Sequence, residues 1–117
     1  MSMESALQTL LAAICPRAYP DVAPLGTAAP WIVWQGLGGE SVRMLDNTAA
    51  DKRNTLMQVA VYAPTRLQAL QLVRQVEDLV TASPAMVATP EGEPSAIYES
   101  DTRLYGCIQR FSIWADR

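Results

Sequence analysis

The chain has 117 residues, of which half are apolar and 18% are charged, a composition typical of a folded globule and not of a disordered segment. This length predicts one domain over residues 1–117 that buries enough surface to fold without disulfides or metals. The net charge is −3, because nine scattered Lys and Arg residues are outnumbered by twelve Asp and Glu residues. Without a basic stripe, nucleic acid is not expected as a specific ligand.

No membrane segment or export signal is expected from the apolar runs. The stretch before Cys15 has no preceding Lys or Arg, and Ile14 is bulkier than a cleavage site allows. No apolar run approaches the ~20 residues of a membrane span. The sequence therefore predicts a soluble, intracellular protein.

A helix is predicted over residues 3–14, with apolar residues spaced three and four apart. Ser5 is the expected N-cap with Gln8 as its capping-box partner, and Pro16 ends the helix. Residues 17–30 contain three prolines and are expected to be an extended connection. A strand is predicted over residues 31–35, after which three glycines end it.

Residues 40–54 form a long polar stretch, longer than most connections in compact domains. The sequence leaves open a mobile loop or a protruding hairpin with Asp46 and Asn47 near its tip. Such excursions often carry function, so a contact with a partner is expected here. The candidate interface residues are its charged side chains: Arg43, Asp46, Asp51, Lys52 and Arg53.

The second half contains the clearest patterns. Residues 55–63 alternate as a strand, and a helix follows that begins with Thr65 and Gln68 as a capping box and stops at Pro84. A short strand is predicted at residues 86–88. Residues 96–99 and 104–114 form a terminal hairpin, and the long strand carries apolar residues on both faces, which indicates cover on both faces for part of its length.

These elements predict an α+β fold: a mainly antiparallel sheet of about four strands with two helices packed on one face. The expected order is helix, strand, long loop, strand, helix, strand, strand.

No catalytic, metal or cofactor site is predicted, so the chain is not expected to be an enzyme. Histidine is absent, which removes the most common general base and metal ligand. The carboxylate pairs Glu91/Glu93 and Glu99/Asp101 are interpreted as surface charge. The glycines after residue 35 do not lead into a helix, as a phosphate loop requires. Cys15 and Cys107 are interpreted as buried thiols, although the sequence alone leaves a disulfide open.

Several stretches, in order, resemble the small tail-completion proteins of long-tailed bacteriophages, also called tail terminator or tail-to-head joining proteins. The resemblance spans nearly the whole chain and is strongest where the strand 57–63 runs into the second helix. The stretches that carry it are residues 12–16, 18–20, 24–26, 29–35, 57–65, 98–99, 104–105 and 111–114.

This resemblance implies a role in virion assembly. A protein of this kind caps the head-proximal end of the tail tube, meets the head connector and forms a ring, a hexamer on assembly. The expected partners are therefore the tail tube protein, the head-connector or head-completion protein and other copies of itself. The expected location is the bacterial host cytoplasm during assembly and then the virion tail.

Alternatives remain open at this point. Subunits could pair through sheet edges instead of through the loop charges. A ferredoxin-like ligand-binding or regulatory module would show an apolar pocket between helices and sheet. An enzyme subunit would bring distant carboxylates together in a cleft.

Overall fold

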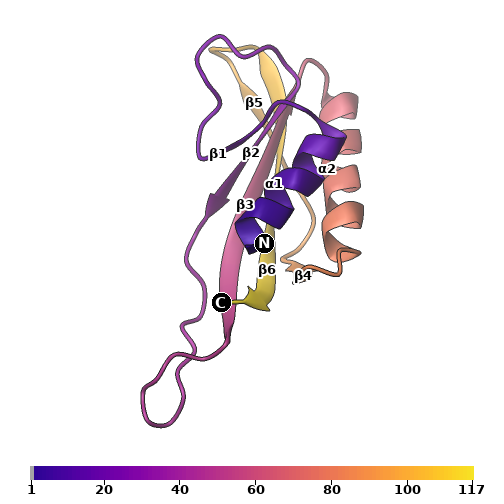
Figure 1. Cartoon of the computed structure of the whole chain (residues 1–117). Coiled ribbons are helices and arrows are strands. Elements are labelled where there is room, and N and C mark those ends of the chain that lie inside the picture. The colour runs from indigo at the N-terminus through magenta and orange to yellow at the C-terminus, as the bar shows by residue number, and fades with distance from the viewer. Residues whose placement is uncertain (1) are drawn as a thin grey trace.

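A computed structural model describes residues 2–117 and shows two helices beside a six-stranded mixed sheet (Figure 1). The strand order is β1-β2-β3-β6-β4, and β5 pairs with the same edge of β6 as β4 does. Only the pairing of β1 with β2 is parallel. In chain order the elements are α1 Met3–Ile14, β1 Ala18–Pro20, β2 Trp31–Gly36, β3 Lys52–Ala63, α2 Arg66–Thr81, β4 Val87–Pro90, β5 Ser95–Glu99 and β6 Leu104–Asp116.

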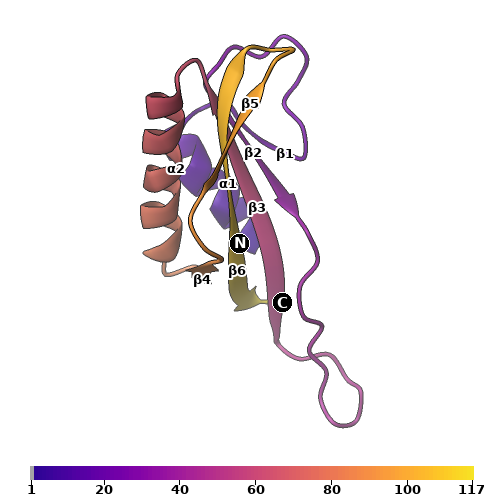
Figure 2. The ribbon, with the colours of Figure 1, turned by 180° about the vertical axis from the view of Figure 1, so that it is seen from behind.

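The two long strands β3 and β6 form the centre of the sheet. They pair antiparallel without a break, from Lys52 opposite Asp116 to Ala63 opposite Tyr105. Alternate residues of each strand point to opposite faces. The face that carries Met57 and Phe111 is buried, and both helices pack on it (Figures 1 and 2). The core therefore lies on one side of the sheet, as the predicted helix arrangement required.

The core is built from the apolar stripes of the helices and one face of the strands. Helix α2 packs on β3, β6 and β4, while α1 packs on α2 and β1. The buried face of α2 consists of Ala69, Val73, Val76 and Val80, whereas Leu79 at its edge is exposed. The fully buried large side chains include Leu7, Leu11, Ile32, Val59, Val73, Val76 and Phe111.

Each helix begins at a side-chain cap. Thr65 accepts a hydrogen bond from the backbone N–H of Gln68, as predicted. For α1, however, the predicted N-cap is wrong: Ser2 accepts from the N–H of Ser5. Gln8 is then free to donate to the Ala18 carbonyl and to accept from the indole N–H of Trp34, so it ties α1 to the first two strands.

The prediction of about four strands is also wrong: the sheet has six, because β1 was not predicted and the short strand near residues 86–88 was not counted among the four. β1 lies within residues 17–30, which were expected to be an extended connection without strand pairing. Its flanking residues Arg17 and Asp21 complete the pairing with β2, at distances of 2.9 and 2.8 Å between donor and acceptor. Pro20 ends β1 but does not prevent it, because proline is tolerated at the end of an edge strand.

The other short strand lies on the opposite side of the sheet. β4 matches the predicted strand near residues 86–88, but both β4 and β5 pair with β6. Residues 91–94 interrupt this edge, and the N–H of Glu91 still donates to the Arg110 carbonyl at 2.8 Å. The edge therefore consists of two short pieces separated by a bend.

Candidate protein-interaction site

Residues 37–51, called the arm below, project beyond the end of the sheet (Figures 1 and 2). The arm is a hairpin and not an irregular loop: Arg43 bridges Ala49 in an antiparallel pair. At its turn, the N–H of Met44 donates to the Thr48 carbonyl at 2.9 Å, and Asn47 adopts a positive φ of 68°. Thus, of the two predicted alternatives, the structure shows the protruding hairpin.

The root of the arm is held against β3. The N–H of Leu37 donates to the Leu56 carbonyl, and the N–H of Leu56 donates to the Gly38 carbonyl. Gly39 has a φ of +135°, and a Cβ atom there would lie 2.5 Å from the carbonyl oxygen of Asn54. Only glycine fits this close approach. The direction of the arm is therefore set by its own sequence.

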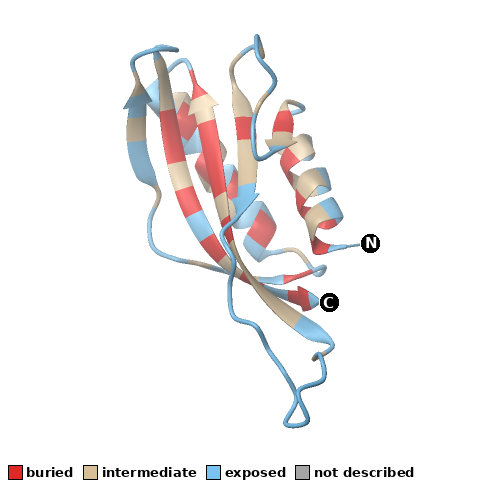
Figure 3. Ribbon diagram, turned by 90° about the vertical axis from the view of Figure 1, so that its left-hand side faces the viewer, coloured by how far each residue is buried: buried red, intermediate tan, exposed pale blue. Residues whose placement is uncertain are grey.

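The tip of the arm is apolar and exposed. Val42, Met44 and Leu45 form no part of the core, and the Leu45 side chain is fully exposed. The burial pattern places the whole arm in solvent (Figure 3). Three apolar residues in an otherwise polar stretch were the available sequence signal, but only the charged residues were named as candidates.

Two of the five predicted interface residues are engaged within the chain. Lys52 and Arg53 belong to β3, which begins three residues earlier than predicted. Lys52 pairs with Asp116, and Arg53 pairs with Glu4 in the first turn of α1. Both pairs lie at the end of the sheet from which the arm projects. One joins β3 to β6, and the other joins β3 to α1.

The other three candidate residues remain on the arm surface. Arg43 is exposed and forms no ion pair with any residue in 2–117. Asp46 accepts hydrogen bonds from the N–H and the hydroxyl of Thr48, and this lowers the pKa of its carboxyl group. The Asp51 side chain is exposed. The structure therefore brings the candidates together along the arm and its root, without a single cluster.

The Arg53–Glu4 pair has a measurable pH signature. The hydrogen bond from Arg53 lowers the pKa of Glu4 below its ordinary value of 4.5. An acid whose pKa is lowered by folding stabilises the native state above that ordinary value, and the contribution is lost as the pH falls through the lowered pKa. Because both side chains are about one-third exposed, solvent screening limits the contribution.

We therefore expect Glu4→Gln to lower the free energy of unfolding by about 0.5–1 kcal/mol at pH 7. The difference from the unmodified chain should shrink as the pH falls below the ordinary value of 4.5. Urea unfolding at several pH values measures it, with Glu40→Gln as a control, since Glu40 has no ion pair within residues 2–117. A difference that stays constant between pH 7 and pH 3 would contradict the assignment.

The sheet face opposite the helices, called the open face below, carries apolar side chains that no helix of residues 2–117 covers. The Trp31 and Tyr62 rings lie 5.6 Å apart at their centroids. Ala60 on this face is buried, but its larger side chains are partly buried or exposed, and Trp114 is 37% exposed. The predicted cover on both faces of β6 is thus absent from this side. Its apolar members are Trp31, Val33, Leu56, Tyr62, Ile97, Ile108 and Trp114.

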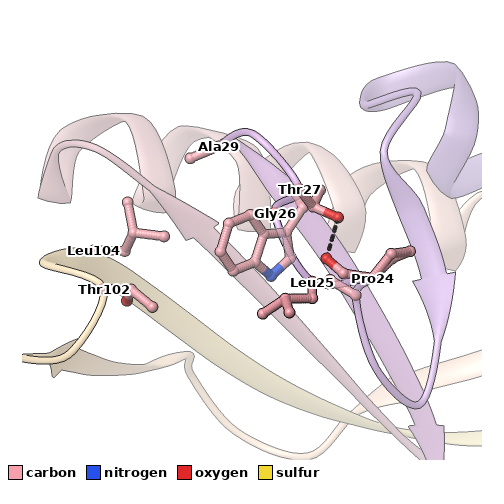
Figure 4. A pocket seen from close by; sticks show the side chains of 9 residues that line it. Pro24, Leu25, Gly26, Thr27, Ala29, Thr102 and Leu104 are labelled. Carbon is pink, nitrogen blue, oxygen red and sulfur yellow. Dashed lines mark hydrogen bonds between the residues drawn. The ribbon is translucent and has the colours of Figure 1, made fainter.

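At one end of the open face lies a hollow of about 540 Å³, called the hollow below (Figure 4). The loop between β1 and β2 forms one wall, where the Thr27 N–H and hydroxyl donate to the Pro24 carbonyl. Thr102 in the turn before β6 and Leu104 at the start of β6 form the other wall. Its lining is Ala23, Pro24, Leu25, Gly26, Thr27, Ala29, Trp31, Thr102 and Leu104. It is not the helix–sheet pocket expected of a ligand-binding module.

Gln109 is a buried polar side chain in the otherwise apolar core, only 2% exposed. Its Nε2 donates to a carboxylate oxygen of Glu77 at 2.6 Å and to the Gly92 carbonyl at 3.0 Å. Gln109 thereby links α2 to the bend that separates β4 from β5. Its Oε1 is buried and accepts no hydrogen bond from residues 2–117.

The cysteines and carboxylates considered as reactive or metal-binding groups can also be placed in the fold. Cys15 and Cys107 are buried, free thiols, and burial raises the pKa of Cys107. Glu93 forms two hydrogen bonds with Arg74, at 2.6 and 3.1 Å, and Glu99 accepts from the Thr102 hydroxyl. Within residues 2–117, no three Cys, Asp or Glu side chains are grouped to hold a metal ion.

Two comparisons with known proteins bear on this arrangement. A family model described as tail completion protein gp17 matches residues 2–116. Among curated proteins, no sequence matches the chain significantly. None of the helices formed by residues 2–117 combines the length and the apolarity needed to cross a membrane.

Proposed function

Because the chain belongs to the tail completion protein gp17 family of structural phage proteins, we propose that it caps the head-proximal end of the tail tube and forms the joint to the head connector. It assembles in the host cytoplasm, as a ring, and remains in the virion tail. The tail tube protein and the head connector are its partners in this proposal, and its role is not catalytic.

The observation that carries this proposal is the arm. It is a hydrogen-bonded hairpin whose root is fixed by Gly39 and Asn54, and it presents apolar side chains to solvent. Exposed apolar side chains on a projecting segment of defined conformation are typical of a site that binds another protein. The open face supplies a second, larger apolar surface. A chain with two such surfaces suits an assembly in which each copy meets more than one neighbour.

The charged candidates have a secondary place in this proposal. Arg43, Asp46 and Asp51 flank the apolar tip and would affect the choice of partner and the rate of encounter more than the affinity. Lys52 and Arg53 serve the interface indirectly, because their ion pairs hold the lower end of the sheet on which the arm stands.

The test uses purified tail tube protein that polymerises in solution, with tube length and end-labelling measured by electron microscopy. We expect tubes grown with the chain to be shorter, to carry the chain at one end only, and to bind connector protein at that end. Tubes grown without the chain are the control. Unchanged tube growth, or chain bound along the whole tube, would overturn the proposal.

A further inference from the structure

Two apolar features lie at opposite ends of the molecule. The tip of the arm is at one end, and the hollow is at the other, beside the turn between β5 and β6 (Figures 1 and 2). The molecule measures 52 Å along its longest axis. Because the root of the arm is fixed to β3, the tip points away from the hollow of its own chain.

We propose that the arm tip of one copy docks in the hollow of the next copy. This inference rests on the proposed function, since it names the contact through which the ring is built. Met44 and Leu45 insert beside Trp31 and Leu104 of the neighbour. The contact joins two different surfaces of the same chain, so it is heterologous, and such a contact closes into a ring when the rotation between copies allows.

The chemistry of the two surfaces matches. The hollow is lined mainly by apolar side chains, and its volume of about 540 Å³ lies in the range of pockets that hold small ligands, which is ample for two aliphatic side chains. The tip offers Met44 and Leu45, neither of which belongs to the core; Leu45 is fully exposed and Met44 is 58% exposed. The central part of an interface is typically a well-packed pocket with an aromatic residue, and Trp31 supplies that residue in the hollow.

The charges beside the two surfaces are also complementary. Arg43 adjoins the tip, while Asp21 and Asp101 adjoin the hollow, and these three side chains are exposed. Asp46 on the turn is matched by Arg103 near the hollow. Opposite charges around an apolar centre fix the register of two partners and exclude wrong ones.

Sheet-edge pairing is a poorer explanation of self-association here. β1 has three residues and ends at Pro20, while β4 has four and ends at Pro90, and Pro94 precedes β5. Short edge strands with proline are a common protection against strand addition. The sheet edges are therefore closed to extended pairing, whereas the arm and the hollow are open.

Disulfide trapping tests the contact directly. In a chain with both Leu45→Cys and Leu25→Cys, mild oxidation should give a ladder of linked copies on non-reducing gels, ending in a closed ring. Both positions are fully exposed and so can be changed without loss of fold, and native Cys15 and Cys107 are buried. Each single variant is the control, because one new cysteine can link at most two copies.

The trapping is performed on the free chain at high concentration and on the chain bound to tube ends. A ladder specific to the double variant in either condition supports the contact. Absence of a specific ladder in both conditions, or linkage of Leu45→Cys to the tube protein instead, overturns it. If the chain caps tubes and no ladder forms, only this inference fails. If a ladder forms and tubes grow unchecked, the capping function fails.

An affinity measurement gives the second readout. Leu45→Asp should weaken self-association, measured by light scattering or by ring formation at tube ends, roughly 30-fold. Leu67→Asp is the matched control, because Leu67 is exposed on α2 and lies outside the arm and the hollow. Equal association of Leu45→Asp and the unmodified chain would also overturn the proposal.

Discussion

Replacing Phe111 by alanine is expected to lower the free energy of unfolding by about 3–5 kcal/mol. Phe111 is fully buried in the middle of β6, opposite Met57 of β3 and Pro90 of β4. Its ring fills the core between the sheet and the helices, so its removal costs the transfer energy and also leaves a cavity. Because domains of this size are stable by about 5–15 kcal/mol, the loss should be large enough to shift the urea midpoint strongly.

Trp114→Ala is the matched control for this prediction. Trp114 is a larger aromatic residue on the same strand, but it lies on the open face and is 37% exposed. We expect its loss to cost less than half as much as the loss of Phe111. Equal destabilisation by the two changes would contradict the placement of the core on one face only.

The helices and central strands could be predicted because each has a strong local pattern. Helix α1 was predicted with its observed bounds, since apolar residues spaced three and four apart allow no other regular structure before Pro16. The strand alternation around Met57 and Phe111 likewise predicted which residues share a face, although it did not show which face is buried. Local periodicity was sufficient wherever one face of an element is buried.

The strand count and the parallel pair could not be predicted, because they depend on contacts between distant residues. β1 has only three residues, too few to show alternation, and its partner Ile32 lies fourteen positions further on. β3 begins at Lys52, where the strand pairs with the end of β6 and where Lys52 and Arg53 form ion pairs with Asp116 and Glu4. In sequence alone these residues look like part of a polar loop.

The position of the projecting arm was predicted from the sequence, but its apolar tip was not. The projecting arm is where the unpatterned polar stretch indicated a functional excursion, and Asp46 and Asn47 do lie at its turn. Whether a charge is free or engaged depends on the fold, which is why Arg53 could not be told from Arg43. The hollow could not be predicted from the sequence, because its lining combines residues 23–31 with residues 102–104, which are far apart in the chain.

The role of Gln109 could not be predicted from the sequence either. Nothing in an alternating pattern shows that a polar residue will meet Glu77 of a helix and the backbone of Gly92. The bend between β4 and β5 creates an unpaired carbonyl at this point of the edge, and a side-chain amide is the group that satisfies it. Gln109 therefore compensates for the interrupted strand.

Gln109→Glu is expected to destabilise the fold by about 3–4 kcal/mol at pH 7. The change replaces the amide N–H donors with a carboxylate that faces the Glu77 carboxylate and the Gly92 carbonyl in a buried position. Burial and the like charge both raise the pKa of the new carboxyl group in the folded state. Folding must then take up a proton, at a cost of about 1.4 kcal/mol for each pH unit above the unfolded pKa of about 4.3.

The pH dependence separates this effect from a simple packing defect. For an acid whose pKa is raised by folding, the penalty is absent below the unfolded pKa and grows as the pH rises towards the folded pKa. Urea unfolding of Gln109→Glu should therefore approach the unmodified chain near pH 4 and diverge from it by pH 7. Gln109→Leu introduces no titratable group and also removes the unpartnered Oε1, so its cost should stay below about 2 kcal/mol and change little with pH. If the loss of unfolding free energy in Gln109→Glu changed as little with pH as that in Gln109→Leu, the new carboxylate would have to reach solvent. The bend at residues 91–94 would then open more easily than its hydrogen bonds to Gln109 and Arg110 indicate.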